Sequence, residues 1–241
     1  MIKIQDIKVS LKIIACCLGL ACNTASEKEN APIIPLQENV SMEIDGEISD
    51  WNGLKQTFLV ENFVAPWHQG DHGKTLFKSI SDGEWVYFYF EAEDLSPVVV
   101  PFAQEDDVAQ GDRVEFFVSG DPELGTYYCA ELAPDGNVLD YEAKYYRKFD
   151  SSWNLKNLEV KTKSIKNGYR VEGKLPVSFF KALDPEAKDN SCTIWLGLYR
   201  ADFISLEEGK DQVNWMTWIN PEVEEPDFHI PSSFQKIMLM Y

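Results

Sequence analysis

The sequence predicts an all-β protein, an antiparallel β-sandwich of the jelly-roll or immunoglobulin-like type with one short helix. The chain has 241 residues, of which 13% are aromatic, including seven Trp, and aromatic residues favour strands. Short segments rich in aromatic and β-branched residues recur, separated by turns of Gly, Asp, Asn and Pro. The sequence lacks a long amphipathic helical run.

The N-terminus has the pattern of a targeting segment. Three lysines precede an apolar run of nine residues, 13–21, which is too short to span a bilayer because a spanning helix needs about 20 residues. We predict that residues 1–21 are a lipoprotein signal peptide and that Cys22 is lipidated. Cys16 and Cys17 are alternative acceptors on spacing, and an ordinary secretory signal is the other interpretation.

The mature chain is then predicted to be exported and lipid-anchored at the cell envelope, in the outer membrane or at the cell surface. Residues 22–35 are small and polar at their start and predict a flexible tether. No composition break follows, so we expect one domain over residues 36–241. Such a chain can bury about 70% of its unfolded surface without disulfides. Whether Cys129 and Cys192 pair is left open by the sequence.

Two segments give the clearest strand patterns. In residues 85–94, Val86, Phe88, Phe90 and Ala92 share one face, which should point to the core. In residues 112–119, the apolar positions 114, 116 and 118 alternate with Arg113, Glu115 and Phe117. The other predicted strands are 56–63, 74–81, 126–132, 138–146, 158–165, 168–175, 193–199 and 235–241. Residues 176–183 predict the helix, with Pro176 in its first turn.

The net charge of −18 excludes several classes of partner. Binding to nucleic acid needs Lys and Arg concentrated on one face, and the folded part is too acidic to adsorb to anionic lipid, so contact with a membrane is expected only through the N-terminal lipid. The sequence has no nucleophile elbow, phosphate-binding glycine loop or C-x-x-C pair. His68 and His72 lie in a loop-like segment, and we predict no metal site there.

The aromatic residues favour a binding function. A sugar presents flat apolar faces, which aromatic rings cover, and an edge of hydroxyls, which polar side chains bind. Arg113, Glu115, Glu131 and Arg200 are polar residues on otherwise apolar strands. Aromatic residues in loops or at strand ends are Trp67, Tyr145, Tyr146, Trp153, Trp215 and Phe228.

Two other chemistries stay open. A glycoside hydrolase of xylanase type needs a carboxylate pair in one cleft, and Glu115, Glu131, Glu142 and Glu172 all lie on predicted strands. A haem-binding redox domain on a related sandwich could use Met216 or His229 as ligand.

A series of motifs in order resembles the family 9 carbohydrate-binding modules and, more closely, the family-9-like exported proteins of Bacteroidetes-type bacteria, which have a DOMON-like sandwich. The resemblance runs through about 200 residues. The matching segments are Ile44-Asp45-Gly46 with Asp50-Trp51, residues 81–87, Asp112-Arg113-Val114-Glu115-Phe116, residues 127–136, residues 168–176, Leu198-Tyr199-Arg200, Trp218 and residues 228–234.

The resemblance implies a β-sandwich that binds a poly- or oligosaccharide such as a glucan or xylan, without catalysis of its own, in a polysaccharide-degrading system with a glycoside hydrolase as a partner. Glu115 falls on a glutamate that contacts sugar, and Phe228 falls where one of two sandwiching Trp residues stands. Residues 109–111 (Ala-Gln-Gly) replace the other Trp, so Trp67 is expected to close the cleft. The resemblance implies no cofactor, although structural calcium occurs in the family, and residues 105–107 could offer oxygens.

Overall fold

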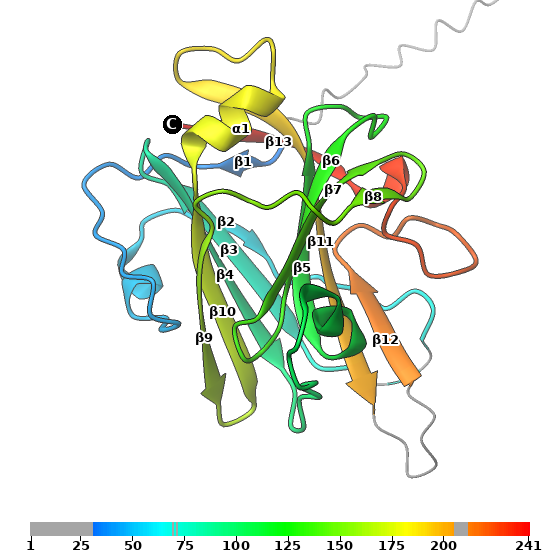
Figure 1. Cartoon of the computed structure of the whole chain (residues 1–241). Helices are drawn as coiled ribbons and strands as arrows, with labels where there is room; N and C mark the ends of the chain where they lie inside the picture. The colour runs from blue at the N-terminus through cyan, green and yellow to red at the C-terminus, as the bar shows by residue number, and fades with distance from the viewer. Residues whose placement is uncertain (1–30, 69, 71, 205–211) are drawn as a thin grey trace, which may run out of the picture. The chain divides into compact units, whose positions relative to one another are not determined.

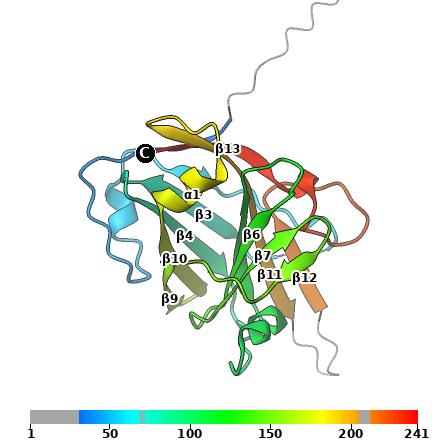
Figure 2. The same ribbon diagram turned by 45° about the horizontal axis from the view of Figure 1, so that its top comes forward.

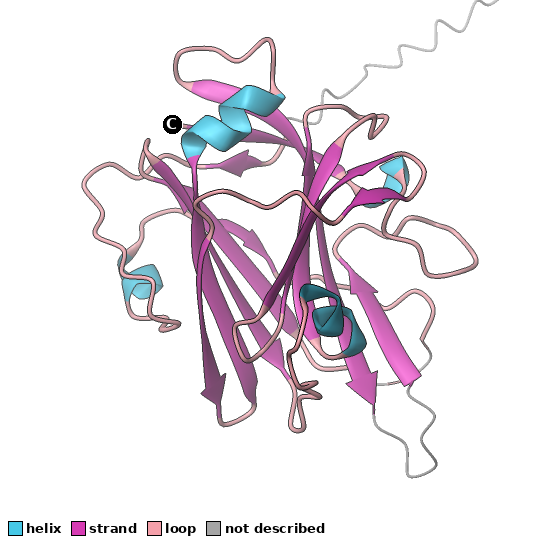
Figure 3. Cartoon of the chain, viewed as in Figure 1, coloured by secondary structure: helices cyan, strands magenta, loops and turns pink. Residues whose placement is uncertain are grey.

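Two mainly antiparallel sheets face each other in the computed structural model (Figure 1). The structure describes residues 31–241 except residues 69, 71 and 205–211, and residues 31–241 form one compact unit. The predicted signal peptide, residues 1–21, and the predicted lipidation site at Cys22 lie outside the described residues. Figure 3 shows that strands and loops dominate the unit, with only short helical segments. The predicted all-β sandwich is therefore confirmed.

The larger sheet has its strands in the order β1-β13-β11-β5-β6-β7-β8, and β12 pairs with the second half of β11. Their bounds are β1 Ile33–Ile34, β5 Arg113–Ser119, β6 Tyr127–Leu132, β7 Val138–Lys144, β8 Lys148–Asp150, β11 Ser191–Ile204, β12 Gln212–Thr217 and β13 Gln235–Met240. Seen in the turned view, β6, β7, β11 and β12 lie together on one side of the unit (Figure 2).

The smaller sheet has the order β2-β3-β4-β10-β9. Its strands are β2 Phe58–Val60, β3 Thr75–Ser81, β4 Trp85–Glu93, β9 Glu159–Ile165 and β10 Gly168–Pro176. The helical segments are α1 Val177–Leu183 and the 3₁₀ turns η1 Asp50–Gly53, η2 Glu105–Gln110 and η3 Pro231–Ser233. Among the described residues, no helix is long and apolar enough to cross a membrane.

The alternation of side chains on β4 and β5 sets the core between the sheets. Phe88 and Phe90 on β4 and Val114 and Phe116 on β5 are buried in one hydrophobic cluster, and the rings of Phe88 and Phe116 lie 5.1 Å apart. The predicted core faces of both strands are confirmed, because successive side chains of a strand point to opposite faces. The side chains on the outer face of each sheet therefore pack against other segments of the chain.

Each outer face carries its own smaller hydrophobic cluster. On the smaller sheet, Tyr87 and Tyr89 pack against Trp51 from the preceding segment. On the larger sheet, Phe117, Tyr199 and Phe228 belong to a cluster that the segment between β12 and β13 helps to cover. The second arrangement brings loop residues onto β5, β6 and β11, and it creates the candidate site.

Most predicted strands match within one or two residues, and three differ. Residues 138–146 form β7 only to Lys144, after which the chain turns into β8. The predicted strand 193–199 extends to Ile204 as β11, while β2 covers only three residues of the predicted segment 56–63. Cys129 and Cys192 are free, because Cys129 lies in the outer cluster and Cys192 in the core.

Candidate functional site

A cleft of about 430 Å³ lies on the outer face of the larger sheet. Its volume is in the range of small-molecule sites. Strands β5, β6 and β12 provide its floor, and the β7–β8 turn and the loop before η3 provide its walls. The lining residues are Arg113, Glu115, Glu131, Arg147, Trp215, Pro226, Phe228 and His229.

A buried arginine between two glutamates forms the floor. Arg113 and Glu115 lie two residues apart on β5, so they point to the same face, and Glu131 pairs with Glu115 across β5 and β6. The Nε of Arg113 donates to Glu131 Oε2 at 2.6 Å and lies 2.9 Å from Glu115 Oε1. Its Nη1 donates to the carbonyl oxygens of Ala109 and Gly111 at 3.1 Å. The guanidinium is therefore fixed in place.

Glu115 keeps an unused acceptor although it is buried. The Nε of an arginine carries one hydrogen, and here Glu131 accepts it, so Glu115 Oε1 has an ion-pair contact but no hydrogen-bond donor among the described residues. Burial, followed by the charge of Glu131, raises the pKa of Glu115 to about 8 against the opposing effect of Arg113. Glu131 differs, because its Oε1 accepts a hydrogen bond from the Tyr141 hydroxyl at 2.8 Å.

Four aromatic side chains meet beside this floor. Phe228 stacks on Tyr199 with ring centroids 4.2 Å apart and an interplanar angle of 12°. Trp215 meets Phe228 edge-on at 5.7 Å, and the Arg113 guanidinium lies 5.5 Å from a Trp215 ring centroid. Trp67 contacts Phe228 at 5.9 Å, and its indole N–H donates to Val223 O. Phe228 is thus packed between neighbouring rings, while Trp215 is the tryptophan that lines the cleft.

The loop before η3 is tied to the β7–β8 turn. Asp227 accepts hydrogen bonds from the Tyr146 hydroxyl at 2.6 Å and from Arg147 Nη2 at 2.8 Å, and it also accepts the backbone N–H of His229. His229 lies 3.1 Å from the Tyr127 hydroxyl through Nδ1. Burial, and then the charge of Arg147, lowers the pKa of His229 to about 4, so the ring is neutral at pH 7.

The structure brings five of the six predicted binding residues together and leaves one out. Arg113, Glu115, Glu131 and Phe228 line the cleft, and Trp67 packs behind Phe228. Arg200 is fully buried and points to another group of residues, because neighbouring residues on β11 alternate between the sheet's two faces. Its Nη2 lies 2.6 Å from Asp202 Oδ1 and 3.4 Å from Asp94 Oδ2. Arg200 therefore holds strand ends together rather than lining the cleft.

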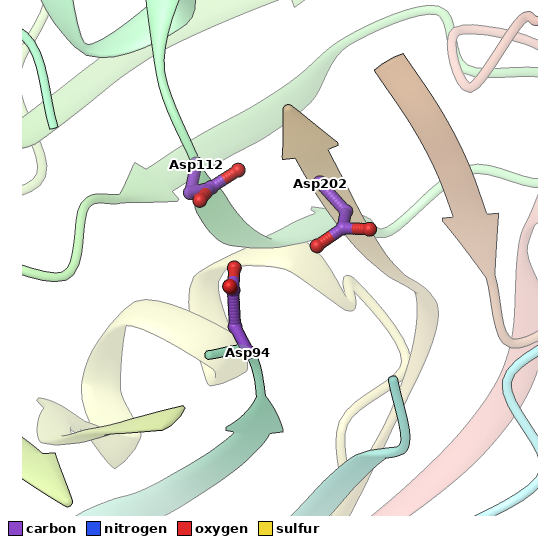
Figure 4. A group of neighbouring side chains, drawn as sticks. All are labelled: Asp94, Asp112 and Asp202. Carbon is purple, nitrogen blue, oxygen red and sulfur yellow. The ribbon is translucent and has the colours of Figure 1, made fainter. Parts of the chain in front are cut away.

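Asp94, Asp112 and Asp202 come from three segments and lie close to one another (Figure 4), and Arg200 contacts Asp94 and Asp202. The residue types could hold a cation, but every carboxylate oxygen already accepts a protein donor. These donors are Ser96 N, Arg200 Nη2, Phe203 N, Val98 N and Asn214 Nδ2. Burial, with a smaller contribution from Asp94, raises the pKa of Asp112 to about 7, against the backbone donors of Phe203 and Val98. As arranged, the cluster fits hydrogen bonding and proton sharing better than calcium coordination.

The acidic run 105–107 forms η2, and it has a local role at Asp107. The carboxylate of Asp107 accepts the backbone N–H groups of Ala103 and Gln104 and so caps the turn. Structural calcium therefore stays a prediction from the resemblance.

Sequence reasoning missed four lining residues as parts of the site: Arg147, Trp215, Pro226 and His229. Trp215 had a usable signal, because Val213, Trp215 and Thr217 alternate with Asn214 and Met216, as in a strand. Arg147 had none. It occupies a turn with a left-handed φ of 54°, directly after the predicted strand 138–146.

The fold and the cleft define a β-sandwich binding domain with a polar and aromatic site on one outer sheet face. The family model for carbohydrate family 9 binding domain-like proteins matches residues 44–240. The chain belongs to this family. Among curated proteins, none matches the sequence.

Solved structures support the same fold. A protein from Bacteroides uniformis proposed to bind carbohydrate is 16% identical with a TM-score of 0.66, and the match covers 87% of this chain and 100% of that one. A family 9 module from Caldicellulosiruptor kristjanssonii in complex with cellotriose is 18% identical with a TM-score of 0.55, and the match covers 87% of this chain and 93% of that one. A family 9 module from that organism in complex with glucose is 18% identical with a TM-score of 0.53, and the match covers 86% of this chain and 95% of that one.

Proposed function

We propose that the protein is a non-catalytic carbohydrate-binding lipoprotein that holds a poly- or oligosaccharide, such as a glucan or xylan, at the cell envelope for degradation. The bound sugar lies in the cleft on β5, β6 and β12. Family membership and the ligands of the two Caldicellulosiruptor complexes support carbohydrate as the class of ligand.

The observation that carries the proposal is the state of Glu115. A buried carboxylate oxygen without a hydrogen-bond donor is unfavourable, and sugar hydroxyls are donors of the right kind. Arg113 beside it is fixed, so the site is organised before the ligand arrives. Trp215 offers an aromatic surface next to these polar groups.

The same geometry argues against hydrolysis by Glu115 and Glu131. A retaining hydrolase places the sugar between two carboxylates about 5–5.5 Å apart. Here the Arg113 guanidinium contacts both carboxylates, and Glu131 is also held by Tyr141. Both carboxylates are therefore tied to one guanidinium, which is not the arrangement of a nucleophile and an acid on opposite sides of a glycosidic bond.

A haem site that uses both Met216 and His229 does not fit the geometry. Met216 is buried in the core between the sheets, whereas His229 packs against Phe117 and Tyr127 on the outer face. The sheet separates the two side chains, so they do not converge on one iron. A visible spectrum of the purified protein without a Soret band tests this conclusion.

The anchor and the partner are the parts of the proposal that rest on sequence. The signal-like segment and Cys22 support export and lipidation, which mass spectrometry of the native protein tests through the mass of an acylated N-terminal Cys22. A glycoside hydrolase as partner is expected because a surface that only binds glycan needs an enzyme to degrade it.

The functional test is a glycan-array screen of residues 31–241, the compact unit, with a reducing-sugar assay on the glycans that bind. We expect binding to a plant-type glycan without release of reducing sugar. Release of product by pure protein contradicts the non-catalytic assignment. Failure to bind any glycan on the array contradicts the proposed function itself.

A further inference from the structure

The β7–β8 turn and strand β8 place exposed aromatic side chains at the mouth of the cleft. Tyr146 is 49% exposed and Phe149 is 50% exposed, while Arg147 between them lines the cleft. All three residues of β8 are exposed, and β8 is the last strand of its sheet. Large aromatic side chains that are clustered and half-exposed mark interaction sites more often than scattered ones.

This turn is held rigidly against the cleft. Tyr146 and Arg147 both bind the Asp227 carboxylate, at 2.6 and 2.8 Å, and the Arg147 guanidinium lies 5.4 Å from the Tyr146 ring centroid. Asp227 precedes Phe228 and His229, which line the cleft. The positions of Tyr146 and Arg147 are therefore fixed relative to the cleft.

Phe149 continues the cleft wall outward. Its ring meets His229 edge-on at 5.1 Å and Tyr141 at 5.3 Å. His229 lines the cleft, and Tyr141 bonds Glu131 on the cleft floor. Phe149 is thus an exposed ring in direct contact with a residue of the cleft wall, with the charged groups of Arg147 and Asp227 close to the same wall. Rings for sugar faces and charged groups for hydroxyls are the combination that a saccharide requires.

On the basis of the proposed function, we infer that Tyr146, Arg147 and Phe149 form a second sugar subsite outside the cleft. One sugar residue occupies the cleft, and the next residue of the chain lies on Phe149 with its hydroxyls toward Arg147. The protein therefore binds an oligosaccharide more tightly than the corresponding monosaccharide, and it does so through the β7–β8 turn.

The test compares wild type with Phe149→Ala by isothermal titration calorimetry on four probes: glucose, cellotriose, xylose and xylotriose. Phe102→Ala is the matched control, because Phe102 is 47% exposed and is not among the residues that line the cleft. We expect wild type to prefer a trisaccharide to its monosaccharide. Phe149→Ala should weaken the trisaccharide about tenfold, or about 1.4 kcal/mol, and change the monosaccharide less than about twofold. Phe102→Ala should change neither.

Three results overturn the inference, and they separate it from the proposed function. Unchanged trisaccharide affinity in a folded Phe149→Ala variant removes the subsite and leaves the cleft. Equal losses for trisaccharide and monosaccharide assign Phe149 to the cleft itself. Wild type that binds a trisaccharide no more tightly than its monosaccharide also removes the subsite, whereas wild type that binds no glycan removes both. Circular dichroism and the melting temperature of each variant establish folding.

Discussion

Each sheet buries a glutamate on its outer face, and the two glutamates have opposite surroundings. Glu172 on β10 is fully buried and fully bonded: its Oε2 accepts the backbone N–H groups of Asp45 and Gly46 at 3.0 and 2.9 Å, and its Oε1 accepts the Trp51 indole N–H at 2.7 Å. Glu115 on β5 is equally buried, but one of its oxygens has no donor, and it opens onto a cleft. Burial of a carboxylate alone therefore does not identify a site; unused bonding capacity beside a cleft does.

The comparison also explains two motifs of the family resemblance. The opening Ile44-Asp45-Gly46 with Trp51 closes over Glu172, and Gly46 has a φ of +79° that a side chain rarely adopts. This motif is structural. The Asp112-Arg113-Val114-Glu115 motif divides between two tasks, because Arg113 and Glu115 face the cleft while Asp112 accepts N–H groups from Val98 and Phe203.

The largest expected effect is a loss of stability at Glu172, on the outer face of the smaller sheet. Glu172→Ala leaves three donors without an acceptor, two of them in buried hydrogen bonds, so we expect a loss of about 3 kcal/mol in the free energy of unfolding. Glu172→Gln keeps an acceptor oxygen and should lose less. Urea denaturation measures both variants. A Glu172→Ala protein as stable as wild type would falsify the structural role of this cluster.

The second prediction concerns Glu115, on the outer face of the larger sheet. Glu115→Ala should weaken glycan affinity by about thirtyfold, or about 2 kcal/mol, because removal of one partner of a buried hydrogen bond costs about 1–3 kcal/mol. The unfolding free energy should stay within about 1 kcal/mol of wild type, since no hydrogen-bond donor to Glu115 Oε1 in the described residues is left without its acceptor. Calorimetry and urea denaturation check the two parts. A Glu115→Ala protein as unstable as Glu172→Ala would contradict the difference proposed between Glu115 and Glu172. Unchanged glycan affinity in a folded Glu115→Ala variant excludes Glu115 from the site.

The third prediction uses the titration of Glu115. Its pKa is about 8 in the folded protein against an ordinary value of 4.5, so the folded state binds more protons between these values and stability must fall as pH rises from 4.5 to 8. Arg113, Glu131, Cys129 and Tyr141 surround it and remain in both proteins compared. Glu115→Gln should remove more than about 1 kcal/mol of the decline between pH 5 and 9. Parallel pH profiles for the variant and wild type exclude a raised pKa at Glu115.

The fold was predictable because it depends on local alternation, and the site was predictable only in part. Val114, Phe116 and Val118 identify the core face of β5 directly, which places Arg113 and Glu115 on the other face. The residues that cover that face lie in the segment 215–229, more than 90 positions further along the chain. No local sequence pattern indicates which loop covers which sheet. Arg200 was predicted to bind sugar for the same reason. The sequence shows a charged residue on a strand, but it does not show that Asp94 and Asp202 contact this residue in the fold.

The smallest expected effect separates the two tryptophans beside Phe228. Trp215 lines the cleft, whereas Trp67 packs behind Phe228 with its indole N–H bonded to Val223 O. A bound sugar then contacts Trp215 directly and senses Trp67 only through the position of Phe228. We expect Trp215→Ala to weaken glycan affinity about tenfold and Trp67→Ala less than about threefold. Calorimetry on the two folded variants gives the ratio. The reverse order makes Trp67 the stacking partner, which the resemblance predicts, and shifts the bound sugar from the β5–β12 side of Phe228 to its other side.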